Sequence, residues 1–375
     1  MPVKTSDRPA ARRAGGSPAK AAPKAPAAKP TAKKVAAKNG SAKSSAKQPS
    51  RPAKAAPKQL PSLALRHVWQ GENQIAATPL VWVNGQMLPK NEAKVSVYDH
   101  GLLYGDGVFE GIRVYQGKIF KCRSHMDRMY RCAAKLHLHI PVSPEDMVQI
   151  QRDTIAANSI KDGYIRLVIT RGHGTLGLDP RKCPVPGVIC IADQISLYPP
   201  EFYNTGMRVI VAKRPKTPVA CLDPRIKSLN YLNNILAKME AIEAGCHEAI
   251  MLSQEGWVTE CTGDNLFVVK DGKLFTPPPV SGENDRFAGG LLEGVTRRFV
   301  IDELAPMCDI EVEERMMKLD FLLSADEIFL TGTAAEVIAV PQVDDTKISD
   351  GEGELTNKLR TKFREIVTGD EIPED

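Results

Sequence analysis

The sequence predicts an α+β fold in two domains rather than a regular alternation of strands and helices. Strand patterns follow one another directly around two-residue turns, at 80–88 and at 265–275. Strict βαβ units would instead place a helix after each strand. Helical patterns stand between these groups of strands, and one of them runs unbroken to Ala244. We therefore expect strands and helices that do not alternate as strict βαβ units.

Charge divides the chain into a basic tail and an acidic body. Residues 1–58 contain 15 Lys and Arg against one acid, Asp7, a net charge of +14. The rest holds 35 of the 50 basic and 44 of the 45 acidic residues, a net charge of −9. Because the tail is mostly Ala, Lys and Pro, we expect residues 1–60 to be disordered. It could solubilise the protein, bind nucleic acid or other polyanions non-specifically, or act as a transit peptide, and these alternatives stay open.

Two adjacent prolines, Pro199 and Pro200, mark the predicted domain boundary. We expect a small N-terminal α+β domain over 79–197, a linker over 198–206 and a larger, mixed β-barrel-like α+β domain over 207–370. The chain has no apolar run of membrane-spanning length, and its eight cysteines form no C-x-x-C pair. We therefore expect a soluble, cytoplasmic protein with neither a disulfide framework nor a metal site, and organellar import through the tail stays an alternative.

Turn and cap residues set the expected order of elements. Asn84-Gly85, Gln116-Gly117 and Asp271-Gly272 are two-residue hairpin turns. Three glycines within 100–107 predict a loop that comes close to a ligand. In the first domain we expect two strands within 80–88, two within 108–122, helices over 124–138 and from Ser143, and strands over 164–172 and 187–195. In the second we expect a strand from Met207, a helix over 227–244, strands over 248–253 and 257–261, the hairpin over 265–275, a loop over 277–290, helices over 294–305 and 319–325, strands over 310–315 and 327–340, and a closing helix over 353–367.

Lys227, in the segment IKSLNYLNN, stands at the predicted start of a helix. A helix start carries a partial positive charge, which disfavours the ammonium form and makes a neutral, nucleophilic amine more available. Tyr231 would share its helix face, four residues on. An ordinary solvated lysine at a loop–helix junction is the alternative interpretation.

Three further segments contribute to the same hypothesis. Gly294-Val295-Thr296 begins a helix, and 331–335 (TGTAA) forms a tight turn after a strand, so both offer amides to an anion. Glu260 ends a strand beside small polar residues rather than salt-bridge partners. Taken singly, each could be an ordinary cap, turn or solvated acid. Together with Lys227 they predict a pyridoxal 5′-phosphate site, in which the lysine forms the Schiff base, the amides hold the phosphate and the carboxylate keeps the ring nitrogen protonated.

From Val83 to about Val367 the chain resembles the class IV (fold type IV) aminotransferases, and most of all the branched-chain amino acid aminotransferases. The segments that carry the resemblance are long and keep their order: YDHGLLYGDGVFEGIR, HMDRMY, YIRLVITRG, IKSLNYLNN, EAIMLSQEGWVTECTGDNLF, GVTR and TGTAAEV. One departure is Cys261, after Glu260, where the family often has glycine or serine. Residues 1–60 have no counterpart in the family pattern.

The resemblance implies a role for each matching residue. Lys227 would be the Schiff-base lysine and would carry the proton between the substrate's α-carbon and C4′ of the cofactor. For the cofactor, the resemblance implies phosphate contacts from Arg128, Val295, Thr296 and Thr333, a ring-hydroxyl contact from Tyr231, a ring-nitrogen contact from Glu260, and packing of Leu292 on the ring face. For the substrate, it implies a pocket lined by Phe109, Tyr164, Arg166 and the Tyr104 of a neighbouring subunit, with the backbone amides of Thr333 and Ala334 receiving the α-carboxylate.

The implied activity is transamination of Leu, Ile and Val with 2-oxoglutarate, giving branched-chain 2-oxo acids and L-glutamate by a ping-pong mechanism through the Lys227 Schiff base. Because Tyr104 would act across an interface, the implied active unit is a homodimer or a higher homo-oligomer. A D-amino acid aminotransferase or an aminodeoxychorismate lyase of the same fold is the nearest alternative, and Tyr164-x-Arg166 with TGTAAE favours the branched-chain interpretation. A polyanion-binding protein that functions through its tail is a more distant alternative.

Overall fold

The computed structural model describes residues 79–194, 201–279 and 290–374, all within one compact unit. The tail predicted over 1–60, the prolines Pro199 and Pro200, and most of the loop predicted over 277–290 lie outside the described residues. Helix α5 (Phe202–Thr205) lies in the second half of the predicted linker. The proposed division into two domains stays a prediction.

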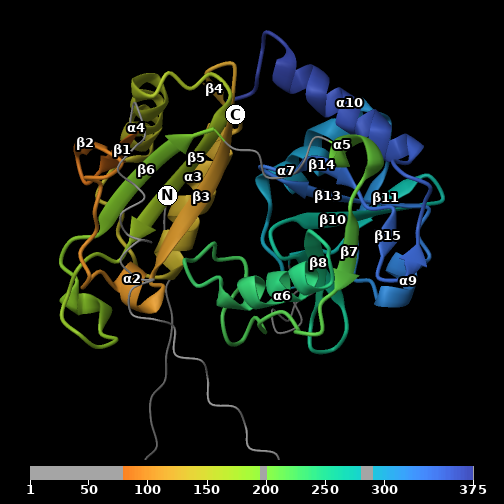
Figure 1. Ribbon diagram of the computed structural model, residues 1–375, viewed down its shortest axis with the longest axis horizontal. Helices are drawn as coiled ribbons and strands as arrows, with labels where there is room; N and C mark the ends of the chain where they lie inside the picture. Colours follow the sequence, from red (N-terminus) through yellow and green to blue (C-terminus); the bar gives the residue numbers. More distant parts are fainter. Residues whose placement is uncertain (1–78, 195–200, 280–289, 375) are drawn as a thin grey trace, which may run out of the picture. The chain divides into compact units, whose positions relative to one another are not determined.

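A six-stranded antiparallel sheet occupies the N-terminal part of the described chain, with the strand order β2-β1-β6-β5-β3-β4 (Figure 1). Helices α3 and α4 pack against it and bury an apolar cluster that includes Met126, Met147 and Ile165. Asn84, Gly85, Gln116 and Gly117 all have positive φ, so both predicted two-residue turns are confirmed. The elements are β1 (Leu80–Val83), β2 (Gln86–Pro89), β3 (Gly107–Tyr115), β4 (Lys118–Ile119), α3 (Cys122–Lys135), α4 (Pro144–Ala157), β5 (Gly163–Thr170), η1 (Pro180–Lys182) and β6 (Gly187–Asp193).

The loop predicted over 100–107 contains a short helix, α2 (His100–Tyr104), and this part of the prediction was wrong. Asp99 caps the helix by accepting a hydrogen bond of 2.7 Å from the Gly101 amide. Gly105 ends it with φ +70. The helix is too short to show an apolar helical period, so only its two caps distinguish it from a glycine-rich loop.

Two five-stranded sheets occupy the C-terminal part, with the orders β12-β11-β10-β13-β14 and β16-β15-β7-β8-β9. Strand β10 shows how they share a core: Leu266 and Val268 face one apolar cluster, and Phe267 and Val269 face another. The first cluster joins the two sheets, and the second receives α7, η3 and α10. The strands are β7 (Arg208–Val211), β8 (Glu248–Leu252), β9 (Val258–Cys261), β10 (Asn265–Lys270), β11 (Lys273–Thr276), β12 (Val312–Glu314), β13 (Glu327–Gly332), β14 (Glu336–Ala339), β15 (Gln342–Val343) and β16 (Thr346–Lys347).

Helices complete this part of the chain. They are α6 (Leu232–Glu243), α7 (Val295–Phe299), the π-helical η3 (Val300–Leu304), α8 (Ala305–Met307), α9 (Leu319–Leu323) and α10 (Glu354–Thr368). Within the three described ranges, none of the helices has the length and apolarity needed to cross a membrane. The N-terminal sheet is antiparallel, whereas both C-terminal sheets are mixed, because β12 pairs in parallel with β11, and β7 pairs in parallel with β8 and β15. Sheets of both kinds with helices packed on them confirm the predicted α+β class.

Candidate active site

Lys227 lies in an extended segment, not at a helix start as predicted. Helix α6 begins only at Leu232, and residues 227–229 run beside the start of β3. The Lys227 carbonyl accepts a hydrogen bond of 3.0 Å from the Phe109 amide, and the Leu229 amide donates one of 2.9 Å to Gly107. A Cβ at Gly107 would lie 2.4 Å from the Ile169 carbonyl oxygen on β5 and 2.6 Å from Leu229 Cδ1, so glycine is needed where β3 approaches both segments. Pairing with β3 therefore fixes the lysine backbone.

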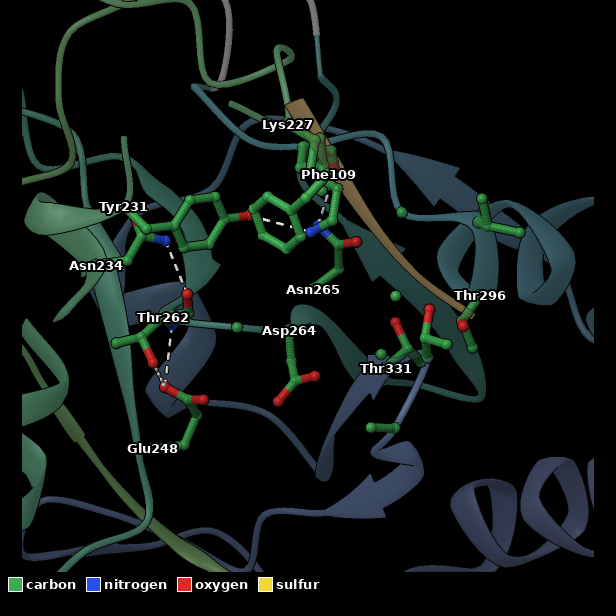
Figure 2. Close-up of a pocket in the computed structure, with 18 of the residues that line it drawn as sticks. Phe109, Lys227, Tyr231, Asn234, Glu248, Thr262, Asp264, Asn265, Thr296 and Thr331 are labelled. Atoms are coloured by element: carbon green, nitrogen blue, oxygen red, sulfur yellow. Dashed lines mark hydrogen bonds between the residues drawn. The ribbon is translucent and has the colours of Figure 1, made fainter. Parts of the chain in front are cut away.

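The amine of Lys227 reaches two aromatic side chains (Figure 2). Its Nζ lies 3.1 Å from the Tyr231 hydroxyl and 4.4 Å from the centre of the Phe109 ring. Burial, and then the positive charge of Arg128, lower the pKa of Lys227 to about 8. The helix start contributes less directly than predicted, because Lys227 lies four residues before Tyr231, the residue that caps α6. A lysine whose pKa is lowered in this way supplies a neutral amine near neutral pH.

Arg128 is held by a buried acid that the sequence analysis did not single out. Its Nε and Nη2 donate hydrogen bonds of 2.7 and 2.6 Å to the two carboxylate oxygens of Glu110, and its Nη1 donates one of 2.8 Å to the Glu293 carbonyl. His125 Nδ1 lies 2.7 Å from the same carboxylate. Burial alone would raise the pKa of Glu110, but Arg128 and His125 hold it well below its usual value. Three of the five guanidinium N–H groups thus have oxygen acceptors among the described residues, and Nη2 also lies 3.5 Å from His125 Nδ1. One N–H of Nη1 therefore remains for a ligand.

Glu260 is a partner in a buried ion pair, contrary to the expectation that it lacks salt-bridge partners. Its Oε1 lies 2.5 Å from Lys216 Nζ, and its Oε2 accepts hydrogen bonds from the Leu292 amide at 2.9 Å and from Asn265 Nδ2 at 3.3 Å. Lys216 stands 44 residues away in sequence, so local composition did not reveal it. Burial raises the pKa of the adjacent Cys261 thiol well above its usual value, so this thiol stays protonated.

One cavity of about 350 Å³ collects the other predicted groups. The start of α7 and the turn after β13 both contribute to its wall. Thr331 Oγ1 is buried there and has no hydrogen-bond partner in the described part of the chain. The predicted site residues that line this cavity are Phe109, Arg128, Tyr164, Arg166, Lys227, Tyr231, Leu292, Val295, Thr296, Thr333 and Ala334. The structure therefore brings together all of them except Glu260 and Tyr104.

The guanidinium of Arg166 lies against the aromatic side chains of the cavity. The Arg166 guanidinium lies over the rings of Phe109 and Tyr164, with Cζ 4.7 and 5.5 Å from the ring centres. Its Nη2 donates a hydrogen bond of 3.2 Å to the Tyr164 hydroxyl. A Cβ at Gly111 would lie 1.7 Å from that hydroxyl oxygen, so Tyr164 occupies the space that glycine leaves free.

Tyr104 lies outside the cavity of its own chain. Its hydroxyl accepts a hydrogen bond of 3.0 Å from the Gly177 amide, and its ring packs edge-on against His100. Exposed apolar side chains surround it on and before α2. They are Val95, Val97, Tyr98, Leu102 and Leu103.

Comparison with known proteins agrees with this site. The class IV amino-transferase family model matches residues 107–343. A Methanocaldococcus jannaschii relative is 47% identical over 77% of this chain and 96% of its own length. The branched-chain amino acid aminotransferase of Escherichia coli has a TM-score of 0.74 and 33% identity, over 79% of this chain and 96% of its own. The T.th. branched-chain amino acid aminotransferase, solved with pyridoxamine 5′-phosphate, has a TM-score of 0.72 and 35% identity, over 78% of this chain and 95% of its own. It has also been solved with N-(5′-phosphopyridoxyl)-L-glutamate and with 4-methylvaleric acid.

The chain belongs to the class IV aminotransferases. The fold type IV architecture that the sequence predicts is thereby confirmed, and pyridoxal phosphate is the cofactor. The residues of this class IV site fit that group. A lysine of lowered pKa can attack the aldehyde. The remaining N–H of Arg128 and the Thr331 hydroxyl, which has no partner among the described residues, can receive the phosphate.

Several residues in contact with the predicted ones were not predicted. Glu248 lines the cavity and accepts hydrogen bonds from the Thr262 amide and hydroxyl. Lys216, Asn265 and Glu110 hold predicted residues in place. Only Glu110 had a signal in the sequence, because an acid inside the apolar strand VFEGIRVY needs a buried partner.

Proposed function

We propose that the chain transfers the amino group of Leu, Ile and Val to 2-oxoglutarate, giving branched-chain 2-oxo acids and L-glutamate. The observation that carries the proposal is the position of Arg166, whose guanidinium lies over Phe109 in the cavity that contains Lys227. The aromatic faces suit a branched aliphatic side chain. The guanidinium suits the second carboxylate of glutamate. The T.th. relative has been solved with a glutamate adduct and with a branched aliphatic acid, which supports binding of the same two kinds of substrate here.

The residues around Lys227 would hold the cofactor at both ends. Arg128, Val295, Thr296 and Thr333 would contact the phosphate, Tyr231 the ring hydroxyl, Glu260 the ring nitrogen and Leu292 the ring face. Bound pyridoxal phosphate supplies an aldehyde that takes up the amino group and a ring that withdraws electrons from the substrate's α-carbon. Glu110 holds the Arg128 guanidinium, which also donates to the Glu293 carbonyl next to the start of α7.

Lys227 would move the reacting proton. Its Nζ is anchored at 3.1 Å from the Tyr231 hydroxyl, and a neutral amine there can take the proton from the α-carbon. The backbone amides of Thr333 and Ala334 would receive the substrate's α-carboxylate and so orient the C–H bond toward this nitrogen. The second half of a ping-pong cycle uses the same groups in reverse when 2-oxoglutarate enters.

The test is a substrate comparison with the purified protein loaded with pyridoxal phosphate. L-leucine, D-alanine and aminodeoxychorismate are each supplied, the first two with 2-oxoglutarate. We expect 4-methyl-2-oxopentanoate and L-glutamate from L-leucine, and no product from the other two. Turnover of D-alanine or aminodeoxychorismate without turnover of L-leucine would overturn the proposal.

The proposed active unit is a homodimer in which Tyr104 serves the neighbouring site. Tyr104 lies outside its own cavity, beside the exposed apolar side chains of α2. Helix α6 adds a second exposed apolar stripe, spaced to lie on one helix face. Its members are Leu232, Ile235, Met239 and Ile242. Exposed apolar surfaces of this kind typically mark contacts with another chain.

We also propose that the enzyme works in the cytoplasm. All eight cysteines are unpaired, which is the usual state of thiols in a reducing compartment. Any nucleic-acid contact would be made non-specifically by the basic tail. Fractionation of cells and a salt-dependence measurement on DNA–cellulose with and without residues 1–58 test these two points.

A further inference from the structure

We propose that Lys216 is a positioning residue for the cofactor, acting through Glu260. It holds the Glu260 carboxylate in place for the ring nitrogen. The inference rests on the proposed role of Glu260 and extends it to a residue outside the cavity wall.

Backbone and side-chain contacts hold Lys216 in place. It lies between β7 and α6, and its backbone amide donates a hydrogen bond of 2.8 Å to the Leu252 carbonyl at the end of β8. Its Nζ lies 2.5 Å from Glu260 Oε1 on β9 and 3.5 Å from Asn234 Oδ1 on α6. The exposed fractions of Lys216 and Glu260 are only 5% and 6%. The two charges therefore meet away from water.

A buried carboxylate keeps its charge only when it is paired or hydrogen-bonded. Glu260 has the charge of Lys216 on one oxygen and the N–H groups of Leu292 and Asn265 on the other. Without Lys216, the Glu260 carboxylate would lose its charged partner and the contact that orients one of its oxygens. It would then be less well placed to meet a protonated ring nitrogen, as the proposed role requires.

The geometry leaves room for the ring nitrogen as well. A carboxylate offers about four acceptor positions, and three donors use Glu260 among the described residues. One position therefore remains for a further N–H donor. Because Lys216 approaches Oε1 while the other two donors approach Oε2, it also fixes which way the carboxylate plane turns.

Lys216 also acts on Tyr231, which lies near the Lys216–Glu260 ion pair. Burial and the negative charge of Glu260 raise the pKa of Tyr231 to about 12, and the positive charge of Lys216 opposes that rise. The lysine thus reduces the repulsion between Glu260 and any negative charge that develops on the phenol. Both effects come from a residue that is not among those lining the cavity.

The experiment is a double-mutant cycle on pyridoxal phosphate binding. The variants are Lys216→Met, which keeps the length and removes the charge, Glu260→Gln, and the two combined. Lys216→Arg is the matched control that keeps the charge. The dissociation constant is measured by titrating cofactor into the cofactor-free protein, and the visible absorption of the bound cofactor is recorded against pH.

We expect Lys216→Met to weaken binding about tenfold and to shift the pH dependence of the absorption. In the Glu260→Gln background the same change should have little further effect, and Lys216→Arg should restore most of the affinity. An equal loss in both backgrounds, or an unchanged affinity and spectrum in Lys216→Met, would overturn the proposal.

Thermal unfolding of the cofactor-free variants gives a second test if Lys216→Met folds poorly. Its melting temperature should rise when Glu260→Gln is added, because the buried charge no longer lacks a partner. If the melting temperature does not rise, the proposal is contradicted. These measurements need no amino donor, so a failure to turn over L-leucine would contradict the proposed function while leaving the role of Lys216 to be decided separately.

Discussion

The amine nitrogen of Lys227 lies 3.1 Å from the hydroxyl oxygen of Tyr231, although neither residue lies within a helix. The contact is made possible by the pairing of residues 227–229 with the start of β3. Burial and Arg128 lower the pKa of the lysine, so the amine is neutral in part near neutral pH. The position of this one nitrogen has consequences that can be measured.

Capture of pyridoxal phosphate by the cofactor-free protein should accelerate with pH, with a midpoint at about 8. The neutral amine is the nucleophile, and its fraction rises as pH passes through the pKa of Lys227. Stopped-flow mixing with the cofactor over a series of pH values measures this midpoint. Lys227→Ala should show no such phase, and a midpoint near the ordinary lysine value of 10.5 in the wild type would contradict the lowered pKa.

Glu110→Gln should destabilise the protein far more than the loss of an exposed ion pair. Removing one member of a buried pair leaves Arg128 uncompensated, which costs about 3–5 kcal/mol. The control is Asp302→Asn, which breaks the exposed Arg298–Asp302 pair on one helix face and should cost at most about 0.5 kcal/mol. Urea unfolding measures both free energies. Equal losses in the two variants would contradict the role assigned to Glu110.

The same carboxylate should make stability depend on pH. Its folded pKa is lowered below the ordinary value of 4.5, so the unfolded chain binds the proton more readily in acid. The contribution of Glu110 is therefore fully present above pH 4.5 and is lost as pH falls toward the folded pKa. The free energy of unfolding should drop more steeply below pH 4.5 in the wild type than in Glu110→Gln. Parallel curves would show that other acids dominate.

Gly111→Ala should impair substrate binding more than folding. The new methyl group would lie 1.7 Å from the Tyr164 hydroxyl oxygen, so Tyr164 has to move and Arg166 loses its hydrogen bond. Such overpacking costs about 1–3 kcal/mol, and we expect kcat/KM for 2-oxoglutarate to fall about tenfold or more. Ile112→Val, in the same strand, should cost about 0.5–1.5 kcal/mol of stability and leave KM unchanged. Wild-type KM values in Gly111→Ala would contradict the packing argument.

Mixing two inactive variants tests whether Tyr104 acts across an interface. Lys227→Ala lacks the amine, and Tyr104→Ala lacks the proposed contribution to the neighbouring site. In a mixed dimer, the subunit that keeps Lys227 would receive Tyr104 from its partner, so one complete site would form. Activity should therefore appear after the two variants are unfolded and refolded together. No gain over the separately refolded variants would place Tyr104 in the site of its own chain or outside both.

Local patterns in the sequence predicted much of the fold but few of the contacts within the site. The two-residue turns at Asn84-Gly85 and Asp271-Gly272 depend on adjacent residues, and both were predicted correctly. Lys227 lines the cavity but does not stand at a helix start as predicted, because its segment pairs with β3, far away in the chain. Lys216 and Glu110 were missed on similar grounds: their charges matter only through partners that the fold brings to them. Arg128 was singled out by the family resemblance alone, since its helix pattern does not predict that it is buried.

The absorption spectrum of the loaded enzyme during the two half-reactions tests the central claim most directly. Adding L-leucine without an oxo acid should convert the absorption of bound pyridoxal phosphate to that of the pyridoxamine form, and adding 2-oxoglutarate should then restore it. Lys227→Ala should show neither change at a comparable rate. A wild-type spectrum that does not respond to L-leucine, or that responds only to D-alanine, would contradict the account.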